Sequence, residues 1–127
     1  MSAQNGNNGM PARFKQALQE TEAAGDPQKV ASLFAQGAPL TNLGGDHGTD
    51  ATAFWQKYLE QFREVRSEFT SETVSDTSAA REWQSRGVLA DGKPVEYRGI
   101  SVIEFDGERV TSFRTYYDSA AFVRSGA

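Results

Sequence analysis

Asp118 is the residue whose type and position best suit proton-transfer chemistry. It follows a predicted strand over 109–117, and strand alternation places it on one face with Arg114 and Tyr116. An aspartate in an aromatic pocket has its pKa raised by desolvation, which suits it to remove a proton beside a carbonyl group. Asp118 is equally suited to cap a helical turn over 119–123. General base and helix cap are therefore both open.

Three further side chains could contact a ligand. Asn42 could orient a water or a carbonyl group, or it could satisfy the backbone where the chain enters a glycine turn. Trp83 could stack on a planar ligand, although a tryptophan in a curved sheet commonly belongs to the core. His47 lies in a glycine-rich loop that could act as a lid, and a solvated loop histidine is the simpler interpretation.

Two arginines on predicted strands, Arg98 and Arg114, could bind an anionic group of a substrate. Arginines on long sheets also pair across strands or lie at a dimer interface. The second interpretation is favoured.

Composition excludes several classes of function. The chain has 127 residues, which fits one domain, and its net charge of -4 does not favour nucleic acid or an anionic membrane as a partner. It has no cysteine and one histidine, so we expect no metal and no other cofactor. The polar segment 1–10 lacks the features of a signal peptide. We expect this segment to be disordered and the protein to be cytoplasmic.

The elements that must position these residues follow from periodicity and turn residues. Helices are predicted over 11–24, from Pro27 to Gly37, and from about residue 50 through an apolar face that runs from Phe54 to Val65. A short strand is expected over 38–42. Alternation then predicts an antiparallel meander, with strands over 67–74, 80–89, 95–105 and 109–117. The prediction is one α+β domain over 11–127, in which a curved sheet wraps around the N-terminal helices and encloses a pocket.

Several short motifs in this order resemble the nuclear-transport-factor-like cone fold, and within it the SnoaL-like polyketide-cyclase branch. The resemblance covers about 11–123 and rests on Ala24-Gly25-Asp26, Leu33-Phe34-Ala35, Ala38-Pro39-Leu40, Glu82-Trp83, Asp91-Gly92-Lys93-Pro94-Val95, Arg98-Gly99, Asp106-Gly107 and Tyr116-Tyr117-Asp118. It implies a homodimer and a pocket inside the cone. The fold alone does not imply a reaction.

The better-defined enzymes of this superfamily match only in part. Where ketosteroid isomerases carry a general-base aspartate this chain has Asn42. Their partner acid falls at about Ser101, and their tyrosine falls near Ala17 or Leu18. Limonene-epoxide-hydrolase-like enzymes would share Asn42 and Asp118, but their Arg-x-Asp pair would fall on Trp83 and Ser85. The histidine-based scytalone dehydratase pattern fails because His47 is the only histidine.

Two functions remain from the resemblance and the residues together. In the first, a small apolar carbonyl compound binds against Trp55, Trp83 and Tyr116, with Arg114, Ser101 and His47 as further contacts, and is cyclised, isomerised or dehydrated. Asp118 is the base and Asn42 assists it. In the second, the domain binds a ligand or pairs into dimers without catalysis.

Overall fold

The computed structural model describes residues 9–126, and it describes the burial of their side chains as far as residue 123. The predicted disorder of the tail falls mainly on residues 1–8, which lie outside the described residues. Met10, which the sequence placed in the tail, is buried and begins helix α2 (Met10–Ala24), with Pro11 in its first turn. The helix therefore starts one residue before the position that Pro11 predicts.

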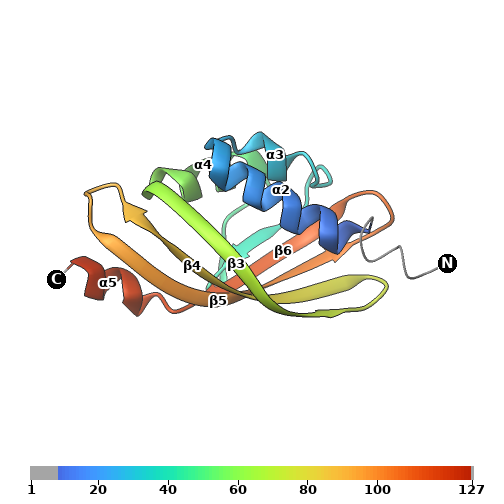
Figure 1. The fold of residues 1–127 in the computed structure, drawn as a ribbon. Coiled ribbons are helices and arrows are strands. Elements are labelled where there is room, and N and C mark those ends of the chain that lie inside the picture. Colours follow the sequence, from blue (N-terminus) through green and yellow to red (C-terminus); the bar gives the residue numbers. More distant parts are fainter. Residues whose placement is uncertain (1–8, 127) are drawn as a thin grey trace.

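Three helices lie together on one side of the sheet: α2, α3 (Gln28–Ala31) and α4 (Ala51–Glu60) (Figure 1). Helix α2 ends at Gly25, whose φ of 66° suits glycine, and the Gly25 N–H donates to the Thr21 carbonyl at 2.9 Å. The buried Thr21 hydroxyl oxygen accepts from the Val30 N–H at 2.9 Å. This bond fixes the corner between α2 and α3. The helix predicted from Pro27 to Gly37 is too long, because α3 ends at Ala31 and Phe34 forms a parallel bridge with Val110.

Six strands form one sheet in the order β2-β1-β6-β5-β4-β3. They are β1 (Leu40–Asn42), β2 (Gly45–Asp46), β3 (Phe62–Val74), β4 (Ser78–Leu89), β5 (Pro94–Phe105) and β6 (Val110–Tyr117). The long strands curve beneath the helices, and α5 (Ala120–Gly126) packs at the far end of the sheet beside β5 (Figure 1). The predicted α+β cone is confirmed. One detail differs, because β1 pairs with β6 in parallel and the sheet is therefore mixed.

The predicted helix through Val65 is too long. Helix α4 begins at the Asp50 cap, whose carboxylate accepts from the Ala53 N–H at 3.0 Å, and it ends at Glu60. Phe62 and Val65 are buried residues of β3. A register shift between Phe62 and Glu64 adds one residue, so the two side chains face the same side three positions apart. This spacing imitates the helical period.

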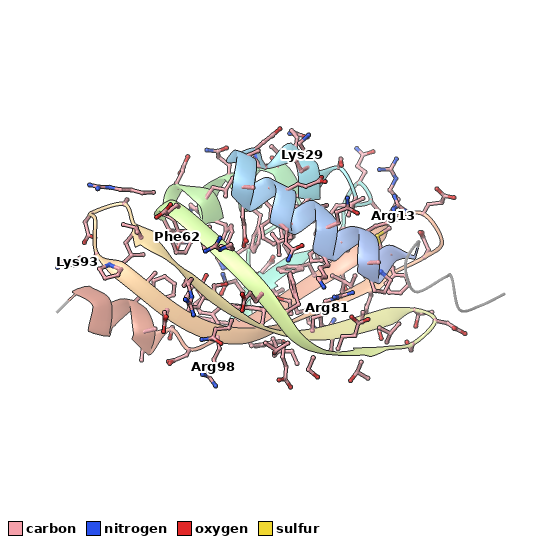
Figure 2. All side chains as sticks on the ribbon, in the orientation of Figure 1. Arg13, Lys29, Phe62, Arg81, Lys93 and Arg98 are labelled. Atoms are coloured by element: carbon pink, nitrogen blue, oxygen red, sulfur yellow. The ribbon has the colours of Figure 1, made fainter. Side chains whose placement is uncertain are left out.

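Side chains alternate between the two faces of the sheet. Toward the helices it presents Ser67, Trp83, Ser85, Tyr97 and Thr115, all of them buried. Charged side chains line the other face, and Arg98 points away from the helices (Figure 2). The concave inner face is therefore the one that can enclose a ligand.

Gly99 allows the indole of Trp83 to lie close against strand β5. A Cβ atom at Gly99 would lie 2.6 Å from Trp83 Cζ2 and 2.4 Å from the Tyr116 carbonyl oxygen. No real side chain tolerates such contacts, so glycine is required at this close approach. Gly99 thereby determines how deep the Trp83 indole sits in the sheet.

The core forms two groups of buried side chains. One lies beneath α2 and includes Phe14, Trp55 and Phe113, and the other lies toward α5 and includes Trp83 and Tyr97. Residues of both groups line one cavity. The predicted pocket is thus located where the two halves of the core meet.

Candidate functional site

A cavity of about 120 Å³ lies between the concave face of the sheet and helices α2, α4 and α5. Its walls are mainly aromatic: Phe54, Trp55, Tyr58, Trp83, Tyr97, Phe113, Tyr117 and Phe122. Polar side chains interrupt these walls at a few positions: Asn42, His47, Lys57, Gln61, Ser67, Ser85, Ser101 and Thr115. An apolar cavity with a few placed polar groups is the usual form of a small-molecule site.

One polar row crosses neighbouring strands on the cavity floor. The Trp83 Nε1–H donates to Ser101 Oγ at 2.9 Å, and Ser101 Oγ lies 2.9 Å from Thr115 Oγ1. Asn42 is the register partner of Thr115 on β1. The two hydroxyls carry two hydrogens, of which one is used between them, so the other is left to donate elsewhere. The row can therefore offer a donor to an oxygen of a ligand.

Trp55 carries a second donor, which is buried in the wall of the cavity. Its side chain is only 3% exposed, it lines the cavity, and its Nε1–H has no hydrogen-bond partner among the described residues. The indole is held by edge contacts with Phe54, Tyr58 and Phe113, at centroid distances of 5.0, 5.6 and 5.1 Å. A buried donor without a partner costs about 1–3 kcal/mol. A ligand that accepts from this N–H would recover part of that cost.

A buried carboxylate lies behind the opposite wall. Glu22 of α2 is 9% exposed and accepts three hydrogen bonds. Tyr58 Oη and Ser67 Oγ each donate to Glu22 Oε2 at 2.7 Å, and the Ser67 N–H donates to Oε1 at 2.8 Å. Ser67 Oγ also lies 2.6 Å from Ser85 Oγ. Tyr58, Ser67 and Ser85 line the cavity, whereas Glu22 does not.

Burial determines the protonation behaviour of this cluster. Desolvation raises the pKa of Glu22 above its usual value, and the bonds from Ser67 and Tyr58 only partly offset this. Burial also raises the pKa of Tyr58, and the nearby Tyr97 and Glu22 raise it further. The pKa of Tyr97 is raised by burial as well. Both phenols are therefore neutral at physiological pH.

Asn42 precedes the turn at 43–48, and His47 belongs to it. Both residues line the cavity. The turn has left-handed backbone at Leu43 (φ 54°) and Gly44 (φ 82°), and the Leu43 N–H donates to the Thr115 carbonyl at 2.9 Å. The His47 ring packs edge-on against Phe54 at 5.9 Å. The turn is thus held by a backbone hydrogen bond to β6 and by the contact between the His47 and Phe54 rings.

Five of the residues singled out from the sequence line the cavity together: Asn42, His47, Trp55, Trp83 and Ser101. The other four, Arg98, Arg114, Tyr116 and Asp118, lie elsewhere. Arg114, Tyr116 and Asp118 do share a face as alternation predicts, but Tyr116 is 41% exposed and borders a groove on the outer face with Asp118. Arg114 pairs with Glu104 at 3.4 Å.

Asp118 takes the position of the helix cap. Its Oδ1 accepts from the Ala120 N–H at 3.1 Å, at the start of α5, and its side chain is exposed. The inward residues of β6 are Phe113, Thr115 and Tyr117, because Tyr117 precedes Asp118 by one position. The base predicted from the sequence therefore lies outside the cavity.

Sequence reasoning missed the buried cluster at Glu22. The signal was present, because Glu22 follows Leu18 by four residues and Phe14 by eight, on the apolar face of α2. An acidic residue in an apolar stripe requires buried partners. Ser67, Ser85 and Tyr97 gave no comparable signal, since they reach the cluster only through strand pairing.

Over residues 9–126 the structure holds no group of three or more His, Asp or Glu side chains that could bind a metal ion. In the same part of the chain no helix is long and apolar enough to cross a membrane.

Comparison with known proteins identifies the family. The SnoaL-like domain family matches residues 15–113, which is most of the chain. Among curated proteins, none matches this sequence.

Solved structures of distant relatives share the fold. A nuclear-transport-factor-like (NTF2-like) protein from Anabaena variabilis superposes with a TM-score of 0.79 at 18% identity, over 87% of this chain and 88% of that one. A protein from Catenulispora acidiphila with a ketosteroid isomerase-like fold, in complex with trimethylamine, superposes with a TM-score of 0.76 at 18% identity. The match covers 89% of this chain and 92% of that one. An LEH-like epoxide hydrolase from M. tuberculosis superposes with a TM-score of 0.71 at 14% identity, over 89% of this chain and 86% of that one.

Proposed function

Because the chain belongs to the SnoaL-like domain family, we propose that its cavity binds a small, mostly apolar molecule that carries a hydrogen-bond acceptor such as a carbonyl oxygen. The observation that carries this proposal is the aromatic cavity with the unpartnered Trp55 N–H in its wall. The hydroxyl hydrogen left over by Ser101 and Thr115 is the second donor available to the same molecule.

The size of the cavity limits the ligand. An engineered cavity of about 150 Å³ is known to take up benzene, and the cavity here measures about 120 Å³. A single ring fits this space, and a four-ring steroid does not. Single-ring ketones are therefore the ligands to test first.

We also propose that the bound compound undergoes cyclisation, isomerisation or dehydration by proton transfer without a cofactor. Support comes from the titratable cluster behind the cavity wall and from relatives of this fold that include an epoxide hydrolase. Asp118 remains the base predicted from the sequence. Since its carboxylate borders the outer groove, it would act there, and proton transfer inside the cavity would fall to other groups.

Binding without catalysis is the second candidate. It is favoured by one observation: no Asp or Glu occurs among the described residues that line the cavity. A protein of this kind would hold its ligand and return it unchanged.

A homodimer through the outer face of the sheet is proposed with either function. Ile100, Val102 and Tyr116 lie partly exposed on this face, among charges of both signs such as Arg98 and Glu82. Such a surface can pair with its own copy about a twofold axis. A cytoplasmic location remains a prediction from the sequence.

A thermal-shift series tests the proposed binding. We expect cyclohexanone or acetophenone to raise the Tm of the protein by an amount that grows with ligand concentration, whereas progesterone does not. Ser101→Leu fills the cavity and should abolish the shift. Ser112→Leu, on the same sheet but outside the cavity lining, is the matched control and should retain it. If no single-ring compound shifts the Tm, binding in the cavity is refuted.

A further inference from the structure

We propose that Glu22 accepts and returns protons for the molecule in the cavity, acting through the hydroxyl of Tyr58. This proposal rests on the proposed function, because it needs a ligand in the cavity. It assigns the proton-transfer step to a buried carboxylate on α2 rather than to a residue of the sheet.

The geometry provides one continuous route. Tyr58 lines the cavity, and its Oη lies 2.7 Å from Glu22 Oε2. Glu22 is itself shielded from the cavity, so a ligand can reach its carboxylate only through an intervening hydroxyl. The second hydroxyl on Oε2 belongs to Ser67, which is backed by Ser85 at 2.6 Å.

Donor counting defines the resting state of the cluster. When Glu22 is ionised it can only accept, so Tyr58 and Ser67 must both direct their hydrogens toward it. The Ser67 N–H fixes the other oxygen at 2.8 Å, which prevents the carboxylate from rotating. Tyr58 Oη then has only lone pairs to offer, one to the neighbouring Tyr97 hydroxyl and the other to the cavity. In this state the hydroxyl can accept a proton from a ligand.

The transfer balances without any added reagent. A C–H bond beside the carbonyl group of the ligand breaks, its proton goes to Tyr58 Oη, and the Tyr58 hydroxyl proton passes to Glu22 Oε2. The electron pair of the broken bond stays on the ligand as an enolate, whose oxygen can accept from the Trp55 N–H or from the Ser101–Thr115 pair. Reversal of the relay returns the proton to the same carbon or to another one. Return to a different carbon is an isomerisation.

The environment permits both states of Glu22. Desolvation holds the pKa of Glu22 above its usual value, which makes its protonated form easier to reach than that of an exposed carboxylate. Tyr58 remains a neutral phenol before and after the transfer, because burial raises its pKa. Tyr58 is therefore the group that touches the ligand, and Glu22 is a positioning residue that stores the proton.

Other titratable groups surround Glu22. Tyr58 from α4 and Tyr97 from β5 interact with it from the cavity side. The groove that Glu22 borders on its other side carries the charged side chains Glu64, Arg66, Glu68, Arg86 and Glu96 of the sheet. The raised pKa values of Tyr58 and Tyr97 keep both phenols neutral near neutral pH. The charged side chains of the groove are the same in the wild type and in each variant, so their titration does not distinguish these proteins.

Hydrogen exchange of a ketone tests the relay. With cyclohexanone in D₂O, NMR measures the loss of the protons beside the carbonyl group, and the full-length protein is expected to accelerate this loss. Glu22→Gln should lower the rate on the order of 100-fold, the usual contribution of an acid–base group, while cyclohexanone still raises the Tm. Glu20→Gln removes a carboxylate from the exposed face of the same helix and should leave the rate unchanged.

The pH profile separates a proton store from a structural role. In the wild type the exchange rate should rise with pH as Glu22 ionises and then level off, whereas Glu22→Gln should lose this rise. If Glu22→Gln does not fold, Tyr58→Phe tests the same route and should also abolish the rise. Exchange that is unchanged in either variant, or ketone binding without any exchange, overturns the relay and leaves the binding proposal intact. Failure of the ketone to bind overturns both.

Discussion

The indole of Trp83 lies so close to Gly99 that a Cβ atom there would stand 2.6 Å from Cζ2. The same indole donates to Ser101 at 2.9 Å and packs edge-on against Tyr97 at 5.3 Å. One glycine on β5 therefore sets the position of a cavity wall, of its polar row and of a phenol that interacts with Tyr58.

Gly99→Ala should destabilise the protein and displace this wall. The added methyl group also meets the Tyr116 carbonyl at 2.4 Å, so the backbone must shift, at a cost of about 1–3 kcal/mol in the free energy of unfolding. Urea denaturation followed by fluorescence measures this cost. Gly107→Ala is the matched control, because a Cβ there meets nothing within 4 Å. Equal stability of the two variants would contradict the contact.

Stability should depend on pH through Glu22 in the direction opposite to most carboxylates. Burial raises the pKa of folded Glu22 above its usual value, so the folded state binds this proton more tightly than the unfolded state does. The stabilisation is complete below the unfolded pKa and is lost as the pH rises through the folded pKa. Relative to Glu22→Gln, the wild type should lose at most about 1.4 kcal/mol per pH unit over that interval.

Urea denaturation of both proteins from pH 4 to pH 8 gives this difference, and other titrating groups largely cancel in it. Glu20→Gln controls for the loss of one carboxylate from α2. If the wild type gained stability relative to Glu22→Gln as the pH rose, the direction assigned to the Glu22 pKa would be wrong.

The fold was largely predictable because its signals are local. Turn residues separate the strands, and the aromatic face of α4 is evident from its spacing. The boundary between α4 and β3 was not predictable. A bulge in β3 places two inward side chains, Phe62 and Val65, three residues apart, which is also the spacing of neighbours on one face of a helix. Pairing of β1 with β6 joins segments far apart in the chain, and nothing in either segment indicates it.

The site was predictable only in part, for a related reason. Asn42, Trp55 and Trp83 were identified as polar or aromatic residues on the expected elements, and the structure places them around one cavity. Asp118 was predicted as the base because it is a carboxylate at the end of a strand. A shift of one position along a strand moves a side chain to the other face of the sheet, and Asp118 lies on the outer face. Glu22 stood on an apolar stripe, and its partners on β3 and α4 become visible only after folding.

Trp55→Phe should weaken ligand binding, and it should destabilise the free protein less than the same change at Trp83 does. The indole N–H has no partner among the described residues, so its removal relieves a buried unsatisfied donor. Loss of one hydrogen bond to the ligand, worth about 0.5–1.5 kcal/mol, corresponds to an increase in Kd of roughly 2- to 13-fold. Titration with acetophenone and thermal unfolding measure the two effects.

Trp83→Phe is the contrasting variant, because its N–H already bonds Ser101 at 2.9 Å. It should lower the Tm of the free protein more than Trp55→Phe does, because both variants lose part of a buried indole but only Trp83→Phe also loses a hydrogen bond. An unchanged Kd in Trp55→Phe would show that the ligand does not accept from this N–H.

Tyr116→Glu should disrupt the proposed dimer and leave the cavity intact. Tyr116 is 41% exposed on the outer face of the sheet, so a glutamate there costs little in a monomer but places like charges together across a twofold axis. Light scattering should find the wild type at twice 13.9 kDa and the variant shifted toward one chain. Val74→Glu changes a residue that is 49% exposed near the end of β3 and should remain dimeric. A monomeric wild type would refute the dimer, and a dimeric Tyr116→Glu would place its interface elsewhere.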